Sequence, residues 1–327
     1  MQVAIVEDID TCERLLPAWR GLDAGGASSI FTSPWWALSS WRHFPDLGHP
    51  QLLLASEPDG SVTSILPLTA GPEKITWAGS PLGDEHDVQV RNAARPAAAE
   101  ALMDSARKLV DPGQTLTLCD VRPDGVLARL GIARQGCPAP TLPLAEADTE
   151  FGDLACIPGW SRTRRRGLRS RRAMLHGTGR VTVERFSDPV GLSDMLPRFV
   201  EARLAAWAER GRLDELPVMD RHPGFPLFIA ESAAGLAMAG KCYLGWLCFN
   251  DQPIAQALYF RTRHSDLLYM STFDERFAKY SPSHLLLAAM ADLAWREGRR
   301  VIELGRGDEP YKFDHGAVAR FLQDVDI

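Results

Sequence analysis

The chain has 327 residues, a net charge of −6, and a composition that is 45% hydrophobic and 24% charged. These proportions are typical of a globular protein, and the length predicts two domains or one large domain. A chain of this length does not need a disulfide scaffold to fold.

Membrane binding and metal binding have no support in the sequence. No apolar stretch approaches the ~18 residues of a membrane span, and the acidic N-terminus lacks the basic region of a signal peptide. The six scattered cysteines form no CxxC pair, and the eight histidines show no HxH or HExxH spacing. We therefore expect a reduced, cytoplasmic protein with no metal and no membrane partner. Nothing in the sequence indicates its oligomeric state.

The first half alternates strand and helix patterns, which predicts a mixed α/β domain. Ser33 and Pro34 form a strong helix start, because serine caps helices well and proline at the first position has its φ already set. Asp59-Gly60 between two apolar runs predicts a hairpin. The predicted strands are 2–6, 51–56, 61–68, 74–78, 115–121 and 141–144, and the predicted helices are 8–22, 33–43 and 95–110.

An acidic stretch that ends in a Pro-Gly turn, residues 144–158, marks a candidate boundary between domains 1–150 and 151–327. The second half again offers helices followed by strands, and its hairpin at residues 241–261 matches the one at 51–68. A duplicated architecture is therefore predicted. The remaining strands are 181–186, 267–272 and 301–304, and the helices are 161–176, 188–210, 225–237 and 281–298.

The segment around Ser281 and Pro282 can form an anion site. A strand leads into a helix whose first N–H groups lack internal partners, and the helix dipole favours negative charge there. This arrangement suits an acyl-CoA or nucleotide enzyme, but it also occurs in folds that bind neither.

Several segments resemble those of a known family. The chain is similar to GNAT-type acyltransferases grouped with the CelD-like proteins, which are related in fold to Fem-type aminoacyl transferases. The segments that carry the resemblance are FTSPWWALSSW, SRTRRRGLRSRRAM, NDQPIAQALYF, YMSTFDERFAKYSPSHLLL and ELGRGDEPYKFD. The resemblance implies an α/β (α+β mixed) fold made of tandem GNAT-like modules, each a mostly antiparallel twisted sheet flanked by helices.

In this family the second module would hold the donor, acetyl-CoA or another acyl-CoA. The thioester would lie along the strand at 268–272, and the pyrophosphate would lie at the start of the following helix. Pro282 departs from the usual glycine-rich phosphate loop. The residues that the resemblance assigns to the donor are Met270, Ser271, Lys279, Tyr280, Ser281, Ser283, His284 and Leu285.

The loop GRGDEPYK, residues 305–312, concentrates polar side chains after a strand. Transfer to an amine needs a base for the nucleophile and an acid for the leaving thiolate. Asp308 or Glu309 could be the base and Tyr311 the acid, while Arg306 or Lys312 could hold a substrate carboxylate or phosphate. The alternative is an ordinary surface turn, because GNAT enzymes often work by positioning alone.

Seven arginines and no acid lie between residues 162 and 172. This basic helix is a solvated face, a clamp on phosphates through Arg165 and Arg169, or a contact for tRNA. The polar cluster Asp84, His86 and Asp87 lies where the family has an acidic motif, which assigns it to the acceptor site. A structural polar loop is the alternative.

The sequence thus predicts an acyl-CoA-dependent N-acyltransferase that moves an acyl group, acetyl in the first instance, to a small-molecule amine in a ternary complex. An aminoacyl-tRNA-dependent transferase of Fem type is the second reading, which makes tRNA a less favoured partner. A GNAT-like module that binds a ligand without catalysis is the third.

Overall fold

The computed structural model describes residues 1–23, 29–91, 96–131, 133–262 and 264–326. The chain folds into two compact units. The first comprises Met1–Pro138 together with the segment from Phe321 onward, and the second comprises Ala139–Arg320. The domain boundary predicted at residue 150 thus lies inside the second unit, and the last strand of the chain returns to the first.

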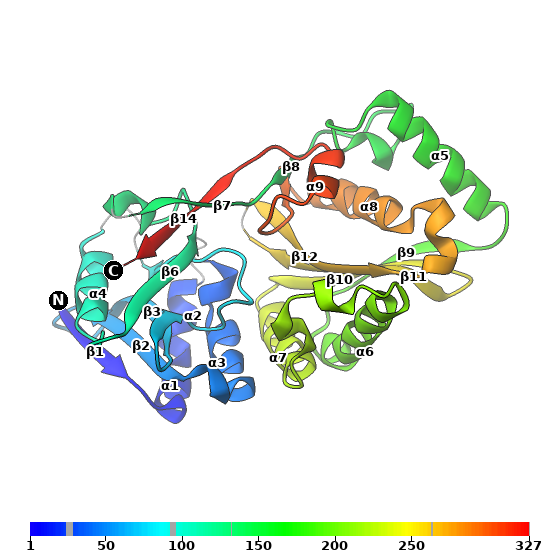
Figure 1. The fold of residues 1–327 in the computed structure, drawn as a ribbon. Helices are drawn as coiled ribbons and strands as arrows, with labels where there is room; N and C mark the ends of the chain where they lie inside the picture. The colour runs from blue at the N-terminus through cyan, green and yellow to red at the C-terminus, as the bar shows by residue number, and fades with distance from the viewer. Residues whose placement is uncertain (24–28, 92–95, 132, 263, 327) are drawn as a thin grey trace. The chain divides into compact units, whose positions relative to one another are not determined.

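The first unit is a twisted sheet covered by helices (Figure 1). Its strands are β1 (Gln2–Val6), β2 (His49–Ser56), β3 (Val62–Ala70), β4 (Lys74–Trp77), β5 (Gln89–Val90), β6 (Thr115–Val121), β7 (Arg134–Pro138) and β14 (Phe321–Asp326). Its α-helices are α1 (Ile9–Arg14), α2 (Leu16–Asp23), α3 (Pro34–His43) and α4 (Ala97–Arg107). The strand order is β1-β2-β3-β4-β6-β14-β7, and β5 pairs with β3.

Alternation along β2 gives this sheet two apolar faces. Leu53 and Ala55 pack in one cluster with residues of α4, whereas Leu52 and Leu54 pack in another with residues of α1, α2 and α3. Successive side chains of a strand point to opposite faces, so a continuous apolar run needs a helical layer on each side. Ser33 caps α3 by accepting the Trp36 N–H at 3.4 Å, as its sequence predicts.

The second unit has the sheet order β8-β13-β12-β11-β10-β9. Its strands are β8 (Thr141–Pro143), β9 (Val181–Phe186), β10 (Cys242–Phe249), β11 (Gln252–Arg261), β12 (Ser265–Phe273) and β13 (Val301–Glu303). Its α-helices are α5 (Arg162–His176), α6 (Pro189–Glu209), α7 (Phe225–Met238), α8 (Pro282–Arg296) and α9 (Pro310–Asp314), with a 3-10 helix η7 (Glu275–Tyr280) before α8.

Helices cover both faces of this second sheet. In Figure 1, α5 and α8 lie on one side of the strands and α6 and α7 on the other. Leu285, Leu286 and Met290 of α8 pack with Leu168 and Leu175 of α5 in the main core of the unit. The helix predicted to be apolar on almost every side is therefore buried between α5 and the sheet.

The two units repeat one connection. In the first, β4 and β6 pair in parallel and α4 connects them; in the second, β12 and β13 pair in parallel and α8 connects them. The other paired strands of the described chain are antiparallel. This architecture confirms the predicted fold class of tandem, mostly antiparallel modules.

Local details differ from the sequence prediction in several places, including strand β5 and helix α9, which were not predicted. The helix predicted over 8–22 is divided at Leu15, between α1 and α2. Strands β7 and β14 were not predicted, because neither shows a strong apolar alternation. They form one end of the first sheet by pairing with each other over a long sequence separation.

Candidate active site

The parallel strands β12 and β13 separate partway along their length. They pair from Ser265↔Val301 to Leu267↔Glu303, and no further pair joins them within the described residues, although β12 runs on to Phe273. Beyond that point, the backbone groups of β12 that face β13 are left for another partner. A buried backbone group needs such a partner. A ligand lying along β12 could supply it.

A β-bulge lies at this same place. Leu258 of β11 pairs with Met270, whereas the next residue, Tyr259, pairs with Leu268, so the register advances two residues on β12 for one residue on β11. A bulge bends its strand and redirects the local backbone groups. The predicted donor residues Met270 and Ser271 follow directly; Met270 is buried and Ser271 is exposed.

The start of α8 offers fewer free amides than the sequence suggests. Ser281 has the left-handed conformation (φ 55°, ψ 54°), and its carbonyl accepts the N–H groups of His284 at 3.1 Å and Leu285 at 3.2 Å. Pro282 has no N–H. Of the first helical residues, Ser283 is the one whose amide makes no backbone hydrogen bond within the described chain. An anion at this position would depend heavily on side chains.

Two arginines of α5 supply positive charge at this helix start. An Nη of Arg171 donates to the Ser281 hydroxyl at 2.9 Å, and an Nη of Arg164 lies 3.1 Å from Nε2 of His284. Both come from a helix that packs against η7 and α8. Seven residues are two helical turns, so Arg164 and Arg171 share one face of α5.

Two neutral histidines lie behind these arginines. The ring centres of His284 and His315 are 4.6 Å apart. The ring centre of Trp160 lies 6.2 Å from that of His284 and 6.5 Å from that of His315. Burial and then the charges of Arg164 and Arg171 lower the pKa of His284 to about 4. Burial, His284 and Arg164 lower the pKa of His315 to about 3. Near pH 7 both are uncharged, so Nε2 of His284 accepts a hydrogen from Arg164.

The predicted phosphate contacts Arg165 and Arg169 lie on a different face of α5. Both guanidinium groups lie over the ring of Phe151, at 5.9 and 5.1 Å. Arg165 also donates to the carbonyl of Ile157 at 3.1 Å, and Arg169 to that of Glu150 at 3.0 Å. These contacts fasten α5 to the preceding segment. The structure places Arg164 and Arg171, not Arg165 and Arg169, beside the predicted phosphate position.

Three other predicted donor residues have mainly packing contacts. Lys279 is exposed, and its ammonium lies 4.9 Å from the centre of the Tyr280 ring, while Tyr280 packs against the core of the unit. Leu285 is buried in that core. The side chain of Leu285 is therefore structural.

The loop at residues 305–312 is held by its own lysine. Lys312 is 2% exposed, and its ammonium donates to the carbonyls of Gly305, Arg306 and Gly307 and forms an ion pair with Glu309 at 2.8 Å. An ammonium has three hydrogens to donate. Lys312 thus fixes the loop backbone, and this placement favours a structural role over the predicted substrate contact.

Most of the other polar side chains of this loop are exposed to solvent. Asp308, Glu309 and Tyr311 are exposed and Arg306 is half-buried. Asp308 makes no hydrogen bond or ion pair within the described chain, whereas Glu309 is paired with Lys312. Of the two predicted bases, Asp308 is the more available.

The predicted acceptor cluster of the first unit is largely buried. His86 is 1% exposed and stacks on Trp77 with ring centres 5.0 Å apart. Asp87 is also 1% exposed, and its carboxylate accepts the N–H groups of Val88, Val126 and Leu127 at 2.9, 2.6 and 3.1 Å. Burial raises the pKa of Asp87 to about 6 despite these bonds. Asp84 is half-buried. The placement of His86 and Asp87 favours the structural alternative for both.

The first unit has a place that corresponds to the opening between β12 and β13 of the second unit. His86 closes this place. Strands β4 and β6 pair at Lys74 and Ile75, and the segment around His86 then forms a parallel bridge with Val121 at the end of β6. The His86 N–H donates to the Asp120 carbonyl at 2.7 Å, and the Arg122 N–H donates to the His86 carbonyl at 2.9 Å. The chain itself occupies the place that β12 and β13 leave open.

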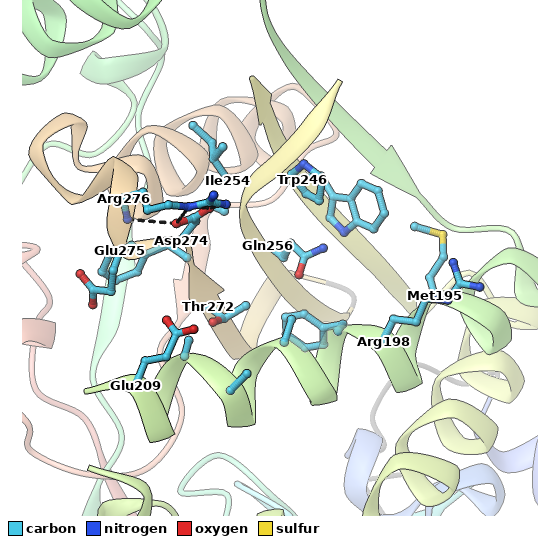
Figure 2. Close-up of a pocket in the computed structure, with 17 residues that line it drawn as sticks. Met195, Arg198, Glu209, Trp246, Ile254, Gln256, Thr272, Asp274, Glu275 and Arg276 are labelled. Atoms are coloured by element: carbon cyan, nitrogen blue, oxygen red, sulfur yellow. Dashed lines mark hydrogen bonds and ion pairs between the residues drawn. The ribbon is translucent and has the colours of Figure 1, made fainter. Parts of the chain in front are cut away.

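A pocket of about 730 Å³ lies in the second unit between α6 and the strands β10, β11 and β12 (Figure 2). Trp246, Gln256 and Thr272 form one row across these strands, since Trp246 pairs with Gln256 and Gln256 with Thr272. Alanines of α6 face the row. The volume of the pocket is in the range of sites that bind small molecules.

Sequence reasoning missed three parts of this region: Arg164 with Arg171, His315, and the pocket. Seven arginines in eleven residues cover every face of a helix, so the letters alone do not show which pair faces α8. The pocket depends on strand register, which no local pattern gives. A spacing of eleven between Arg198 and Glu209, with alanines between them, was a readable sign of one helical face.

The described residues contain no helix with the length and apolarity to cross a bilayer. Within the same residues, no group of three or more His, Cys, Asp or Glu side chains is arranged to hold a metal ion.

Comparisons with known proteins concern the second unit and the fold. Residues 162–313 match the family model described as an acetyltransferase (GNAT) domain. The matched residues lie within the second unit, and the match supports an acyltransferase activity of GNAT type for that unit. No curated protein matches the sequence significantly.

Similar solved structures span nearly the whole chain. The crystal structure of FemX superposes with a TM-score of 0.60 at 14% identity, covering 100% of this chain and 98% of that one. The C-terminal domain of a putative lysylphosphatidylglycerol synthetase from Agrobacterium fabrum gives 0.58 at 11% identity, covering 95% and 92%. A protein of unknown function from Bacteroides thetaiotaomicron gives 0.60 at 13%, covering 99% of each chain. At these identities the likeness shows a shared fold. The narrower resemblance to CelD-like proteins stays a prediction.

Proposed function

We propose that the protein is an acyl-CoA-dependent N-acyltransferase that acts on a small amine. The observation that supports this most is the opening between β12 and β13, which has a bulge on β12 and two arginines at the start of α8. A thioester and its amide-rich arm would lie along β12, where backbone groups lack strand partners. The pyrophosphate would lie beside Arg164, Arg171, Ser281 and Ser283.

The charges fit such a donor. Arginine binds phosphate through a planar fork of N–H donors, and the helix start adds a favourable dipole. His284, held neutral, lets Arg164 keep its full charge for an anion, because the imidazole accepts from it without adding a competing positive charge. The absence of glycines in the phosphate loop is thereby offset by side-chain donors.

The reaction itself exchanges one bond for another. The amine nitrogen bonds to the thioester carbonyl carbon, the carbon–sulfur bond breaks, and one proton leaves the nitrogen while the sulfur gains one. Asp308 would take the proton from the amine, and Tyr311 would deliver a proton to the thiolate. Lys312 would contribute by fixing the loop that presents both side chains.

An aminoacyl-tRNA donor is the second candidate, because the fold matches that of FemX along the whole chain. Arg162, Arg166, Arg169 and Arg171 on α5 are exposed and would contact a nucleic-acid backbone. A helix of this size reaches only a few phosphates, so such binding would weaken steeply with salt. The overall charge of −6 disfavours a large RNA footprint.

The test compares donors by calorimetry at two salt concentrations. We expect acetyl-CoA to bind the purified protein, and free coenzyme A to bind with similar strength because the phosphate contacts are shared. Aminoacyl-tRNA should bind weakly at low salt and not at moderate salt. No binding of acetyl-CoA or of longer acyl-CoA, with tight tRNA binding, would reject the first proposal in favour of the second.

A further inference from the structure

The pocket beside α6 has a charge at each end and neutral polar groups along its floor. Arg198 and Glu209 both line it, and Figure 2 shows them at opposite ends of the α6 segment. Eleven residues are three helical turns, so the two side chains lie on one face of the helix, with their Cα atoms about 16 Å apart along its axis. Ala202, Ala205 and Ala206 occupy the same face between them and leave the space open.

These two end charges have no partners of their own. Within the described chain neither Arg198 nor Glu209 makes a hydrogen bond or ion pair, although the negative charge of Glu209 acts electrostatically on Arg276. The other charged lining residues are already paired: Asp274 with Arg276 at 2.6 Å, and Glu275 with Arg210. Among the described lining residues, Glu209 and Arg198 are thus the charged side chains that form no ion pair, and they lie at opposite ends (Figure 2).

The floor between them can form hydrogen bonds but carries no charge. The side chains of Gln256 and Thr272 point from adjacent strands toward α6, and neither makes a hydrogen bond within the described chain (Figure 2). Phe199, Ile254 and Phe273 add apolar surface. The amide and hydroxyl would bind the polar middle of a ligand, and the apolar groups would bind its carbon skeleton.

We infer that this pocket holds the acceptor, and that the acceptor is an elongated molecule with an amine at one end and a carboxylate or similar anion at the other. This inference rests on the proposed function and specifies its substrate class. The amine end would lie beside Glu209 and Thr272. Thr272 belongs to β12, the strand given to the donor, so the nucleophile enters near the thioester. The anionic end would pair with Arg198.

The test measures kcat/KM with acetyl-CoA for three series of acceptors of matched length. They are straight-chain amino carboxylates with a terminal amine (aminohexanoate, aminooctanoate and aminododecanoate), the corresponding alkylamines, and the corresponding diamines. The native protein should prefer at least one amino carboxylate over its alkylamine counterpart by at least tenfold. Arg198→Glu should reverse the order and favour the diamine. Glu209→Gln should raise KM for all three series.

Arg212→Glu is the matched control, because it makes the same charge change at an exposed arginine that follows α6 and does not line the pocket. It should leave the order of the three series unchanged. Direct calorimetric binding of each acceptor, with no donor present, is measured on the same variants. If acetyl-CoA binds the native protein but Arg198→Glu changes neither the order nor the binding of acceptors, the pocket inference is wrong and the proposed function stands.

If acetyl-CoA does not bind, the proposed function fails on its own. Binding of an amino carboxylate that Arg198→Glu abolishes would then still assign the pocket to a ligand of this charge pattern. Equal binding of amino carboxylates, alkylamines and diamines to the native protein would overturn that assignment.

Discussion

The two units build the same strand–helix–strand connection and use it differently. In the first, the segment between β4 and α4 folds back so that His86 bridges to Val121 and fills the place beside β4. In the second, η7 leads directly from β12 to α8, and the place beside β12 stays open. The difference indicates that the same parallel crossover forms a candidate site where its loop leaves the space beside the strand open, and part of a core where the loop fills that space.

The polar residues of the two units differ in a corresponding way. Asp87 is saturated by three backbone N–H groups of its own unit, whereas Arg164 and Arg171 reach a helix start that has an unbonded amide at Ser283. A cluster of charged residues in the sequence is therefore structural when its hydrogen-bonding groups are saturated by partners of its own unit. It is a candidate site when donors remain on an accessible surface.

The largest effect expected of a substitution tests the structural half of this comparison. Asp87→Ala removes the acceptor of three buried N–H groups and should lower the free energy of unfolding of the first unit by about 3 kcal/mol. Hydrogen exchange resolved by peptide measures this. Asp104→Ala, which removes an exposed pair with Arg107, should cost less than about 1 kcal/mol. Equal effects of the two substitutions would show that Asp87 is not structural.

The second effect tests the open half. Arg164→Glu combined with Arg171→Glu should weaken acetyl-CoA binding by about 2 kcal/mol, roughly 30-fold, because two phosphate donors become repulsive charges. Calorimetry measures the dissociation constant. Arg166→Glu is the control, since Arg166 is exposed on the same helix. A loss as large in the control would point to a diffuse field of α5 in place of a defined phosphate position.

Much of this difference between the two units could not be predicted from the sequence. The elements themselves could: Ser33-Pro34, the Asp59-Gly60 turn and the Ser281-Pro282 start each have local chemistry that determines the backbone. The candidate site could not be predicted in this way, because it depends on contacts between residues that are far apart in the sequence. Whether Asp87 meets solvent or the amides of Val126 and Leu127 is decided some 40 residues away along the chain.

The pH dependence of stability should have opposite signs in the two units. In the second, the pKa of His284 is about 4 and that of His315 about 3 in the folded state, below the ordinary value of 6.5. Their stabilising contribution is complete above pH 6.5 and is lost as the pH falls, because the unfolded chain takes up protons first. In the first, Asp87 has a folded pKa of about 6 against 3.8, so the folded state gains stability as pH falls from 6 toward 4.

Between pH 7 and pH 5 we expect the second unit to lose about 2 kcal/mol through each of the two histidines and the first to gain about 1 kcal/mol through Asp87. Equilibration in urea at each pH, followed by pulsed hydrogen exchange at one fixed pH, measures the units separately. His284→Gln with His315→Gln should flatten the response of the second unit, and Asp87→Asn that of the first. A shared response of both units that survives these substitutions would contradict the assignment.

The smallest expected effect concerns the loop at residues 305–312. The distinction drawn between the two units, between residues with internal partners and residues without them, also applies within this loop. Asp308 has no partner within the described chain, whereas Glu309 is paired with the buried Lys312. Asp308→Asn should lower kcat about tenfold, at the low end for loss of a general base, with little change in unfolding free energy. Glu309→Gln should loosen the loop by about 1 kcal/mol, seen as faster hydrogen exchange there, with a smaller effect on kcat. If instead Glu309→Gln abolishes turnover while the loop keeps its protection, the paired carboxylate is the base, and saturation by internal partners does not mark a residue as structural.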